Sequence, residues 1–388
     1  MTALTLRGVT WDHVRGLGGL VATARTYREM RSDVEVEVEW TTRSLRAFAD
    51  QPVDELARRF DLLYVDHPAI GYAVARECLV ALDHHLDRAA LDDQVASSVG
   101  RSAESYEWEG HRWALATDAA AQVAAYRQDL LERAGVVLPR TWDQVLEAAP
   151  ALRAAGLWMA FPCIPVDAAC AFLAVCTARG EEPFSGEDEV VSRDAGLAAL
   201  DILREVAAAS HPSGLEWNPP RMLEHMSTSD DVAYCPAAYG YSNYARPGFR
   251  PHVVRFAGGP AGTLGGAGLV VSAHTAAVEE ALRYAAFVAD PDTQRTIYFD
   301  GGGQPGHRSA WTDDRINRAS SGFFRDTLEA VDAAYLRPRH DGFLEFQEAA
   351  GRLVHRHLRE GGDPDAALDA MDAAYRDSLA VRTGPEGG

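Results

Sequence analysis

The pattern of apolar and polar residues divides the first part of the chain into strands and helices. Residues 34–40 alternate between apolar side chains and glutamate, which predicts a strand with one buried and one solvated face. Residues 60–65 are nearly all apolar, as expected for a parallel strand that is buried on both faces. A further strand is predicted at residues 4–9, and residues 20–30 predict a helix. This alternation predicts a doubly wound α/β lobe.

A second group of elements follows residue 118. Residues 158–161 and 231–236 predict strands, and residues 168–176 predict an apolar helix. The chain has 388 residues, which is more than one ordinary hydrophobic core holds, so we expect two lobes. The C-terminal part is helical, and such helices usually pack on the second lobe.

The segment from residue 106 to residue 156 is the most informative part of the chain. Gly110 stands between two aromatic strand ends and predicts a short hairpin, after which residues 114–118 continue as an extended segment. Residues 123–134 predict a helix that ends at Gly135, because glycine adopts the left-handed cap conformation readily. Thr141 then opens the next helix with a capping box.

This order resembles the extracellular solute-binding proteins of ABC importers, in the sugar-binding branch. The resemblance rests on YRQDLL in the first helix and GVVLPRTWDQVLEAA at the second. Further along, GGAGLVVS at residues 265–272 resembles the return crossing of that family, and YAAFVADPDTQ at residues 284–294 resembles its next helix. The segment GGGQPGHRS at residues 301–309 occupies the place of the loop that follows this helix in that family. The resemblance runs in the right order from about residue 4 to residue 311.

The resemblance implies a two-lobe fold of the type 2 periplasmic-binding-protein kind, with doubly wound α/β sheets joined by hinge crossings. It implies a first lobe of residues 1–115 and 261–311 and a second lobe of residues 116–260 and 312–388. The implied function is the capture of a small polar ligand, a carbohydrate or a related compound, in an interlobe cleft for an ABC importer. Hinge closure would follow from the higher affinity of the closed form. The partner would be a membrane permease, and we expect a monomer.

Composition excludes several other classes of function. The formal net charge of -20 argues against nucleic acid, because phosphates would be repelled and no basic stripe is present. No run of about 18 apolar residues exists, so no membrane span is predicted. The chain contains no lysine, which excludes a lysine Schiff base and a Walker-type phosphate lysine. We expect no cofactor.

The five cysteines bear on the compartment of the protein. Their spacing matches no zinc pattern and their number is odd, so we expect buried free thiols rather than disulfides. A strand is predicted almost directly after Met1, which leaves no room for a signal peptide. The protein is therefore expected in the cytoplasm as the sequence stands, and outside it if a signal was removed.

Candidate ligand-binding residues of the first lobe follow predicted strands, where α/β sheets expose ligand-contacting side chains. A loop after the first strand crowds a tryptophan with charged residues, a second loop follows the strand at residues 60–65, and the hinge contributes one carboxylate. The candidates are Trp11, Asp12, His13, Arg15, Asp66, His67 and Asp118. The Asp66 side chain is also expected to cap the following helix.

The remaining candidates come from the second lobe and from glycine-rich loops. Three tyrosines close together after a strand predict a wall that stacks on a ligand and binds its hydroxyl groups. The glycine-rich stretch precedes a strand instead of opening a helix, so it predicts close backbone approach rather than a phosphate site. These candidates are Tyr239, Tyr241, Asn243, Gly265, Gly266, Gln304 and Arg308.

No metal site and no catalytic residue are assigned from the sequence. The histidine pairs at residues 84–85 and at residues 355 and 357 have no third ligand in reach by sequence. The segment after the strand at residues 231–236 lacks the second glycine of a nucleophile elbow.

An alternative stays open: a cytosolic enzyme on a repurposed solute-binding fold, doing acid–base chemistry on a captured metabolite. This acid–base chemistry would use the side chains of Asp12, His13, Asp66, His67 and Tyr241. Whether the ligand is neutral or charged also stays open.

Overall fold

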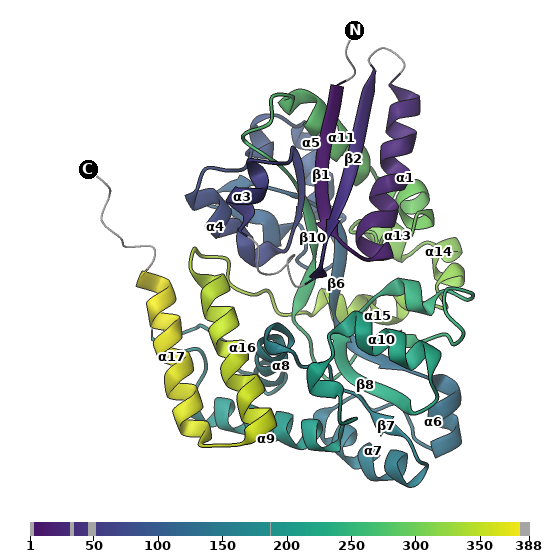
Figure 1. Ribbon diagram of the computed structural model, residues 1–388, viewed down its shortest axis with the longest axis vertical. Helices are drawn as coiled ribbons and strands as arrows, with labels where there is room; N and C mark the ends of the chain where they lie inside the picture. The colour runs from purple at the N-terminus through teal and green to yellow at the C-terminus, as the bar shows by residue number, and fades with distance from the viewer. Residues whose placement is uncertain (1–3, 32–34, 46–51, 187, 381–388) are drawn as a thin grey trace. The chain divides into compact units, whose positions relative to one another are not determined.

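The computed structural model describes residues 4–31, 35–45, 52–186 and 188–380 (Figure 1). The chain forms two compact units. Unit 1 comprises Met1–Ala120, Gly265–Arg318 and Pro338–Asp341, and unit 2 comprises Ala121–Leu264, Ala319–Arg337 and Gly342–Gly388. The fold is the expected two-lobe α/β fold. Within the described ranges, no helix is both long enough and apolar enough to cross a membrane.

Unit 1 is built on a sheet with the strand order β2-β1-β3-β10. β1 pairs in parallel with β2 and β3, and β10 pairs antiparallel with β3. β10 also neighbours β6, whose first half belongs to this unit. The strands are β1 (Leu4–Trp11), β2 (Val36–Arg43), β3 (Leu62–Val65), β4 (Glu107–Trp108), β5 (His111–Arg112), β6 (Leu115–Tyr126) and β10 (Leu264–Val271).

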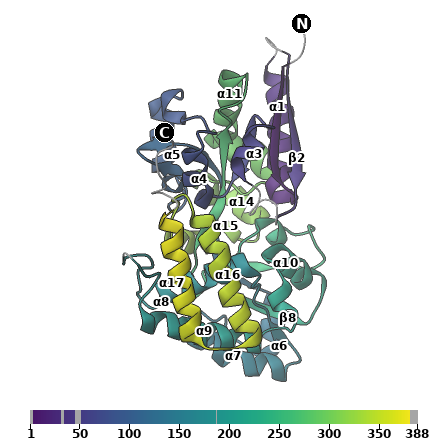
Figure 2. The same cartoon turned by 60° about the vertical axis from the view of Figure 1, so that its left-hand side comes forward.

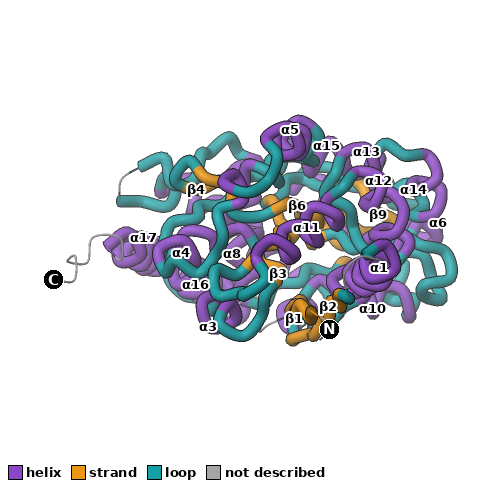
Figure 3. Tube along the Cα trace, turned by 90° about the horizontal axis from the view of Figure 1, so that it is seen from above, coloured by secondary structure: helices purple, strands orange, loops and turns teal. Residues whose placement is uncertain are grey.

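Helices cover this sheet, and α1 lies alongside β1 and β2 in Figures 1 and 3. α1 also packs against α11. The helices and helical turns of unit 1 are α1 (Val14–Met30), α3 (Val53–Ala57), η1 (His67–Ala69), α4 (Ile70–Ala75), η2 (Leu82–His84), α5 (Arg88–Ala96), η3 (Glu104–Tyr106), α11 (Val278–Ala289), α12 (Pro291–Thr293), η6 (Gln294–Tyr298), α13 (Arg308–Trp311) and α14 (Asp314–Ala319).

Unit 2 has its own strands and a larger share of helix. Its strands are the second half of β6, β7 (Trp158–Met159), β8 (Val232–Tyr239) and β9 (Arg255–Ala257), with β8 and β9 both antiparallel to β6. Its helices are α6 (Gln128–Ala134), α7 (Trp142–Ala154), α8 (Pro165–Ala178), α9 (Arg193–Ala209), η4 (Gly214–Glu216), α10 (Pro219–Thr228), η5 (Ser242–Ala245), α15 (Phe323–Asp332), α16 (Phe343–Glu360) and α17 (Pro364–Ala380).

The C-terminal helices belong to unit 2, as expected. α16 packs against α8, α9 and α17, and Figure 2 shows α16 and α17 side by side. Phe343, Phe346 and Tyr375 from these two helices surround the ring of Phe184. The last part of the described chain therefore completes the hydrophobic core of unit 2.

Several predicted elements are confirmed. In β2, Val36 and Val38 are buried, whereas the glutamates between and after them are exposed. Gly135 caps α6 in the left-handed conformation, and the Thr141 hydroxyl accepts a hydrogen bond from Gln144 N–H at the start of α7. Val34, which was assigned to the strand, lies outside the described residues.

The predicted helix at residues 123–134 is wrong in its first turn. Residues 123–126 belong to β6, and α6 begins only at Gln128. Val123 pairs with Ala238 of β8, and Ala124 pairs with Ala257 of β9. Strand partners on both sides thus override the helical preference of the alanine-rich segment.

The cysteines are buried, as expected. All five lie in the described ranges, and none of them forms a disulfide there. Burial raises the pKa of the Cys78 thiol to about 11 and that of Cys176 to about 12. These thiols therefore behave as small apolar side chains.

The glycine-rich stretch at residues 258–268 enters β10 at Leu264, and one of its glycines is sterically required. Gly266 has φ +113°, and a Cβ atom there would overlap the carbonyl oxygen of Asp118 in β6. Glycine at this position therefore lets two backbone segments of unit 1 approach each other closely.

We expect Gly266→Ala to lower the free energy of unfolding by at least about 2 kcal/mol, because strained φ adds to the overlap with Asp118. Gly156→Ala is the matched control, since Gly156 has φ +73° but open space around it. The control should lose only about 1–2 kcal/mol. Urea unfolding of both variants measures the difference, and equal losses would contradict the overlap.

Candidate functional site

A buried ion pair joins the start of α1 to β6 within unit 1. The His13 side chain accepts a hydrogen bond from Arg15 N–H and so caps α1, which places Arg15 in the first helical turn. Arg15 Nε donates to Asp118 Oδ2 at 2.9 Å, and Arg15 Nη2 donates to Asp118 Oδ1 at 2.5 Å. Arg15 is 4% exposed and Asp118 is 1% exposed. The guanidinium thus holds the carboxylate in a bidentate pair away from water.

Two opposing effects act on the Asp118 carboxyl. Burial raises the pKa of Asp118, and the nearby Asp66 adds to this, whereas the charge and hydrogen bonds of Arg15 act in the opposite direction. The positive charge of Arg15 is therefore balanced inside unit 1. An ion pair of this kind does not by itself favour an anionic ligand.

Three buried hydroxyl groups form a hydrogen-bonded group whose two tyrosines interact electrostatically with this pair, and none of the three was predicted as a site residue. The Tyr64 hydroxyl lies 2.5 Å from Thr117 Oγ1 and 3.0 Å from the Tyr298 hydroxyl. The Trp11 and Tyr64 rings are 5.9 Å apart. Burial raises the pKa of both tyrosines above the ordinary range, so their hydroxyl groups stay protonated. Their only sequence signal was the position of Tyr64 inside an apolar strand.

The predicted loop at residues 10–16 is shorter in the structure. Trp11 is buried at the end of β1, and Arg15 lies in α1, so only Asp12 and His13 lie outside regular structure. Asp12 is exposed and His13 is partly exposed. Of this group, these two side chains are the ones that a solute can reach.

Asp66 has the capping role that was expected. Its carboxylate accepts a hydrogen bond from His67 N–H at 2.9 Å and lies 3.2 Å from His67 Nδ1. Asp66 is partly exposed, whereas His67 is buried. Arg43 was missed by the sequence analysis: it pairs with Trp11 in the β1–β2 register at the same end of the sheet. Desolvation lowers the pKa of Arg43 to about 10.

The glutamine and arginine of the loop at residues 301–309 contact backbone. Gln304 is fully buried, and its Nε2 donates to the carbonyl oxygen of Ala119 at 2.9 Å. Arg308 Nε donates to the carbonyl oxygen of Ser98 at 3.1 Å. Gly265 lies in β10 beside Gly266. Gln304 thereby supports the same stretch of β6 that carries Asp118.

Unit 2 contains a hydrogen-bonded group around Tyr239. The Tyr239 hydroxyl lies 2.9 Å from Thr263 Oγ1 and donates to Cys170 Sγ at 3.4 Å. Gln122 Oε1 accepts from both the N–H and the hydroxyl of Thr263, at 3.2 and 3.1 Å. Thr263 and Gln122 were missed because nothing in the sequence places these two residues together.

The predicted wall of three tyrosines is largely buried. Tyr239 is partly exposed, but Tyr241, Asn243 and Tyr244 are each less than 5% exposed. The stacking role therefore stays a prediction. Tyr239 is the best candidate for it, because it is the most exposed of the three tyrosines. Replacement of Tyr241 would also remove buried volume at the start of η5, so its effects on folding and on binding would be mixed.

Asp167 is the strongest candidate for a functional residue among those that the sequence did not indicate. It lies in the first turn of α8 and is 5% exposed, and desolvation raises the pKa of its carboxyl to about 8 against the opposing charge of Arg337. Arg337 donates to Gln347 Oε1 at 2.7 Å and to the carbonyl oxygen of Leu264 at 3.2 Å. At neutral pH, Asp167 is therefore a neutral acid that can donate a hydrogen bond.

The structure brings together histidines that were judged too isolated for metal binding. Asp83 and His111 lie next to His84, so the structure supplies two possible further ligands that the spacing in the sequence did not indicate. His355 Nδ1 lies 2.7 Å from the carbonyl oxygen of Cys163.

Comparisons with known proteins give one family and many similar structures. A sequence model described as bacterial extracellular solute-binding protein matches residues 22–320. A comparison with curated proteins finds no match.

Similar solved structures cover almost the whole chain. A solute-binding protein of Agrobacterium radiobacter in complex with ribitol is 18% identical, with a TM-score of 0.82 over 96% of this chain and 98% of that chain. Maltose-bound MalE3 of T. maritima is 20% identical, with a TM-score of 0.81 over 97% and 100%. The GacH receptor of Streptomyces glaucescens, solved unliganded and with acarbose, is 17% identical, with a TM-score of 0.80 over 98% and 99%. At these identities the likeness shows the fold.

Arg15→Ala should lower the free energy of unfolding by about 3–5 kcal/mol, because it leaves the Asp118 carboxylate buried without its guanidinium. Arg28→Ala on the same helix is the control, since Arg28 pairs with Glu37 at the surface and should cost less than about 1 kcal/mol. The double variant Arg15→Met/Asp118→Leu should lose less than Arg15→Ala. Urea unfolding tests this series, and a loss for Arg15→Ala as small as that of the control would contradict the role of the pair.

Asp167 should make the protein less stable as pH rises from about 4 to about 8. In this window the unfolded chain releases the Asp167 proton while the folded protein retains it, so the free energy of unfolding falls by about 1.4 kcal/mol per pH unit from this group. Asp167→Asn should therefore gain stability over the unsubstituted protein progressively toward pH 8. Asp143→Asn is the control, because Asp143 also lies in the first turn of its helix, α7, but is exposed. If the free energies of unfolding of Asp167→Asn and of the unsubstituted protein change with pH in parallel, Asp167 is ionised in the folded protein and the prediction is wrong.

Proposed function

Because the chain belongs to the family of bacterial extracellular solute-binding proteins, we propose that it captures a neutral sugar or polyol for an ABC importer. The family gives the general role of binding a small solute, and the partner would be the membrane permease of such an importer. The similar structures named above carry ribitol, maltose and acarbose, and all of these ligands are rich in hydroxyl groups.

The bidentate pair of Arg15 and Asp118 is the observation that carries the choice of a neutral ligand. The Arg15 guanidinium, which could otherwise bind an anionic ligand, already holds a carboxylate through two of its donors. Asp12 is exposed and Asp66 partly exposed on the same unit, and both would repel an anion. Hydroxyl groups, by contrast, can donate to these carboxylates.

The side chains that combine polarity with exposure are the best candidates for direct contact. Among the predicted site residues they are Asp12, His13, Asp66 and Arg308 in unit 1 and Tyr239 in unit 2, and of these Arg308 already donates to the carbonyl oxygen of Ser98. The buried residues Arg15, Asp118 and Gln304 would hold these groups in place by their contacts with α1 and β6. We predict that one ligand contacts residues of both units. Variants in unit 1 and in unit 2 test this prediction separately.

A ligand panel tests the proposal directly. We expect calorimetric titration to detect binding of at least one neutral sugar or polyol, and weaker or no binding of the corresponding sugar phosphate or uronic acid. Recovery of the bound compound chemically unchanged supports solute capture, whereas its conversion to product would support the enzyme alternative. Binding of the anionic compounds alone would contradict a neutral ligand.

Conservative variants then test the contacts. Asp66→Asn keeps the capping oxygen and Tyr239→Phe keeps the ring, so both spare the fold while each removes a polar contact. Each should weaken the affinity for the identified ligand by about 10-fold or more, which corresponds to the loss of one hydrogen bond to a polar or charged group. Asp143→Asn should leave affinity unchanged. If both test variants bind normally, the contact residues are wrong even though the ligand class stands.

A further inference from the structure

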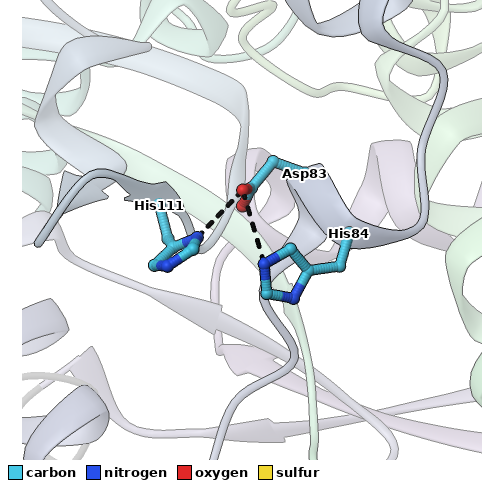
Figure 4. A group of neighbouring side chains, drawn as sticks. All are labelled: Asp83, His84 and His111. Carbon is cyan, nitrogen blue, oxygen red and sulfur yellow. Dashed lines mark hydrogen bonds and ion pairs between the residues drawn. The ribbon is translucent and has the colours of Figure 1, made fainter.

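Three side chains of unit 1 direct metal-binding atoms toward one point at the protein surface. Figure 4 shows that the Asp83 carboxylate lies next to the imidazoles of His84 and His111. His111 Nδ1 is 2.9 Å from Asp83 Oδ2, and His84 Nε2 is 3.9 Å from the same oxygen. The ligand atoms of the three residues all lie within 4.8 Å of one another.

Local structure explains why residues so far apart in sequence meet here. The hairpin of β4 and β5 turns through Glu109 and Gly110, both of which have positive φ, as in a two-residue type I′ turn. This tight turn pairs His111 with Trp108 and holds its imidazole next to η2, which carries the other two residues. The site therefore depends on a turn conformation that glycine favours.

The Asp83 carboxylate is already oriented by the same hairpin. Its Oδ1 accepts a hydrogen bond from Arg112 N–H at 3.0 Å, which leaves Oδ2 facing the two imidazoles. Hydrogen bonds from His111 and Arg112 outweigh the opposing effect of partial burial and lower the pKa of Asp83. A metal-binding carboxylate is typically held in this way by a neighbouring donor.

We propose that Asp83, His84 and His111 form a binding site for a divalent transition-metal ion such as Zn²⁺. Two imidazoles and one carboxylate are ligands that this class of ion accepts. Zn²⁺–ligand bonds of about 2.1 Å in a tetrahedral arrangement require ligand atoms about 3.4 Å apart. The two separations from Asp83 Oδ2, 2.9 and 3.9 Å, lie on either side of that value, so each of these two pairs needs a shift of about 0.5 Å, and the two imidazole nitrogens lie within 4.8 Å of each other.

The nearest arginine does not compete for the carboxylate with its charge. The guanidinium of Arg112 donates to the carbonyl oxygen of Ala103 and to Glu107, at 2.9 and 3.2 Å. Asp83 thus meets only the backbone of Arg112. With both imidazoles neutral, the group carries one negative charge, which a divalent cation would compensate.

A second group, formed by His211, His225 and Asp231 in unit 2, is less suited to a metal. His211 Nδ1 accepts a hydrogen bond from Ser213 N–H at 3.1 Å, so the proton of the neutral ring is on Nε2, the atom that faces Asp231. A metal at that nitrogen would require the proton to move to Nδ1, where it would oppose the Ser213 N–H. His111 Nδ1 also forms a hydrogen bond with Asp83, at 2.9 Å, but within the described residues no backbone N–H donates to the opposite nitrogen of His111 or of His84, so there the proton can move to that nitrogen.

Titration of the full chain with ZnCl₂ after chelator treatment tests the site. We expect one Zn²⁺ per chain and a rise in the thermal midpoint, because the ion would link η2 to the hairpin in the folded state only. His111→Ala and His84→Ala should each weaken Zn²⁺ binding by about 10-fold or more. His85→Ala is the matched control, since His85 is the exposed neighbour of His84 but is not part of the group. Affinity should also fall at low pH, because protons compete with a metal ion for its ligands.

Three outcomes would overturn the proposal: no binding at millimolar Zn²⁺, unchanged affinity in His111→Ala, or loss of affinity in His225→Ala instead. Equal losses in His84→Ala and His85→Ala would also argue against the geometry described. Because solute binding can be measured in the presence of chelator, failure of the metal site leaves the proposed solute-binding function untouched.

Discussion

The short stretch of β6 around Asp118 is the part of unit 1 on which its other interactions converge. Arg15 holds the Asp118 carboxylate, Tyr64 contacts the Thr117 hydroxyl, and Gln304 donates to the carbonyl oxygen of Ala119. The absence of a side chain at Gly266 lets β10 approach the backbone of the same stretch. An ion pair in a buried site is costly to break, so these contacts fix one conformation of the strand at the point where the chain leaves unit 1.

The continuation of β6 in unit 2 is held by a different kind of interaction. There Gln122 accepts two hydrogen bonds from Thr263, and Thr263 contacts Tyr239. Burial raises the pKa values of the Asp167 carboxyl and the Cys170 thiol, against the opposing charge of the Arg337 guanidinium nearby. One strand therefore passes from a stretch held by a buried ion pair to a stretch held by hydrogen bonds between uncharged side chains.

The sequence predicted those features that local patterns determine. Alternation in β2, the left-handed cap at Gly135 and the hydroxyl cap at Thr141 each depend on a few neighbouring residues, and the order of such elements was enough to identify the family. The strand at residues 123–126 could not be predicted, because its partners Ala238 and Ala257 lie more than a hundred residues away. The same holds for side-chain groups: nothing local indicates that Arg15 meets Asp118, that Asp167 is buried near Arg337, or that His111 lies next to Asp83.

Because buried thiols are present in both units, the rate at which each thiol is modified reports how often its unit opens. Cys78 belongs to unit 1, whereas the other four cysteines belong to unit 2. A thiol reagent reacts with the thiolate, and burial suppresses both access to these groups and their ionisation. Each modification event must therefore follow a local or global opening of the unit that contains the cysteine. Mass spectrometry of the modified peptides would then give separate opening rates for the two units, without any introduced label.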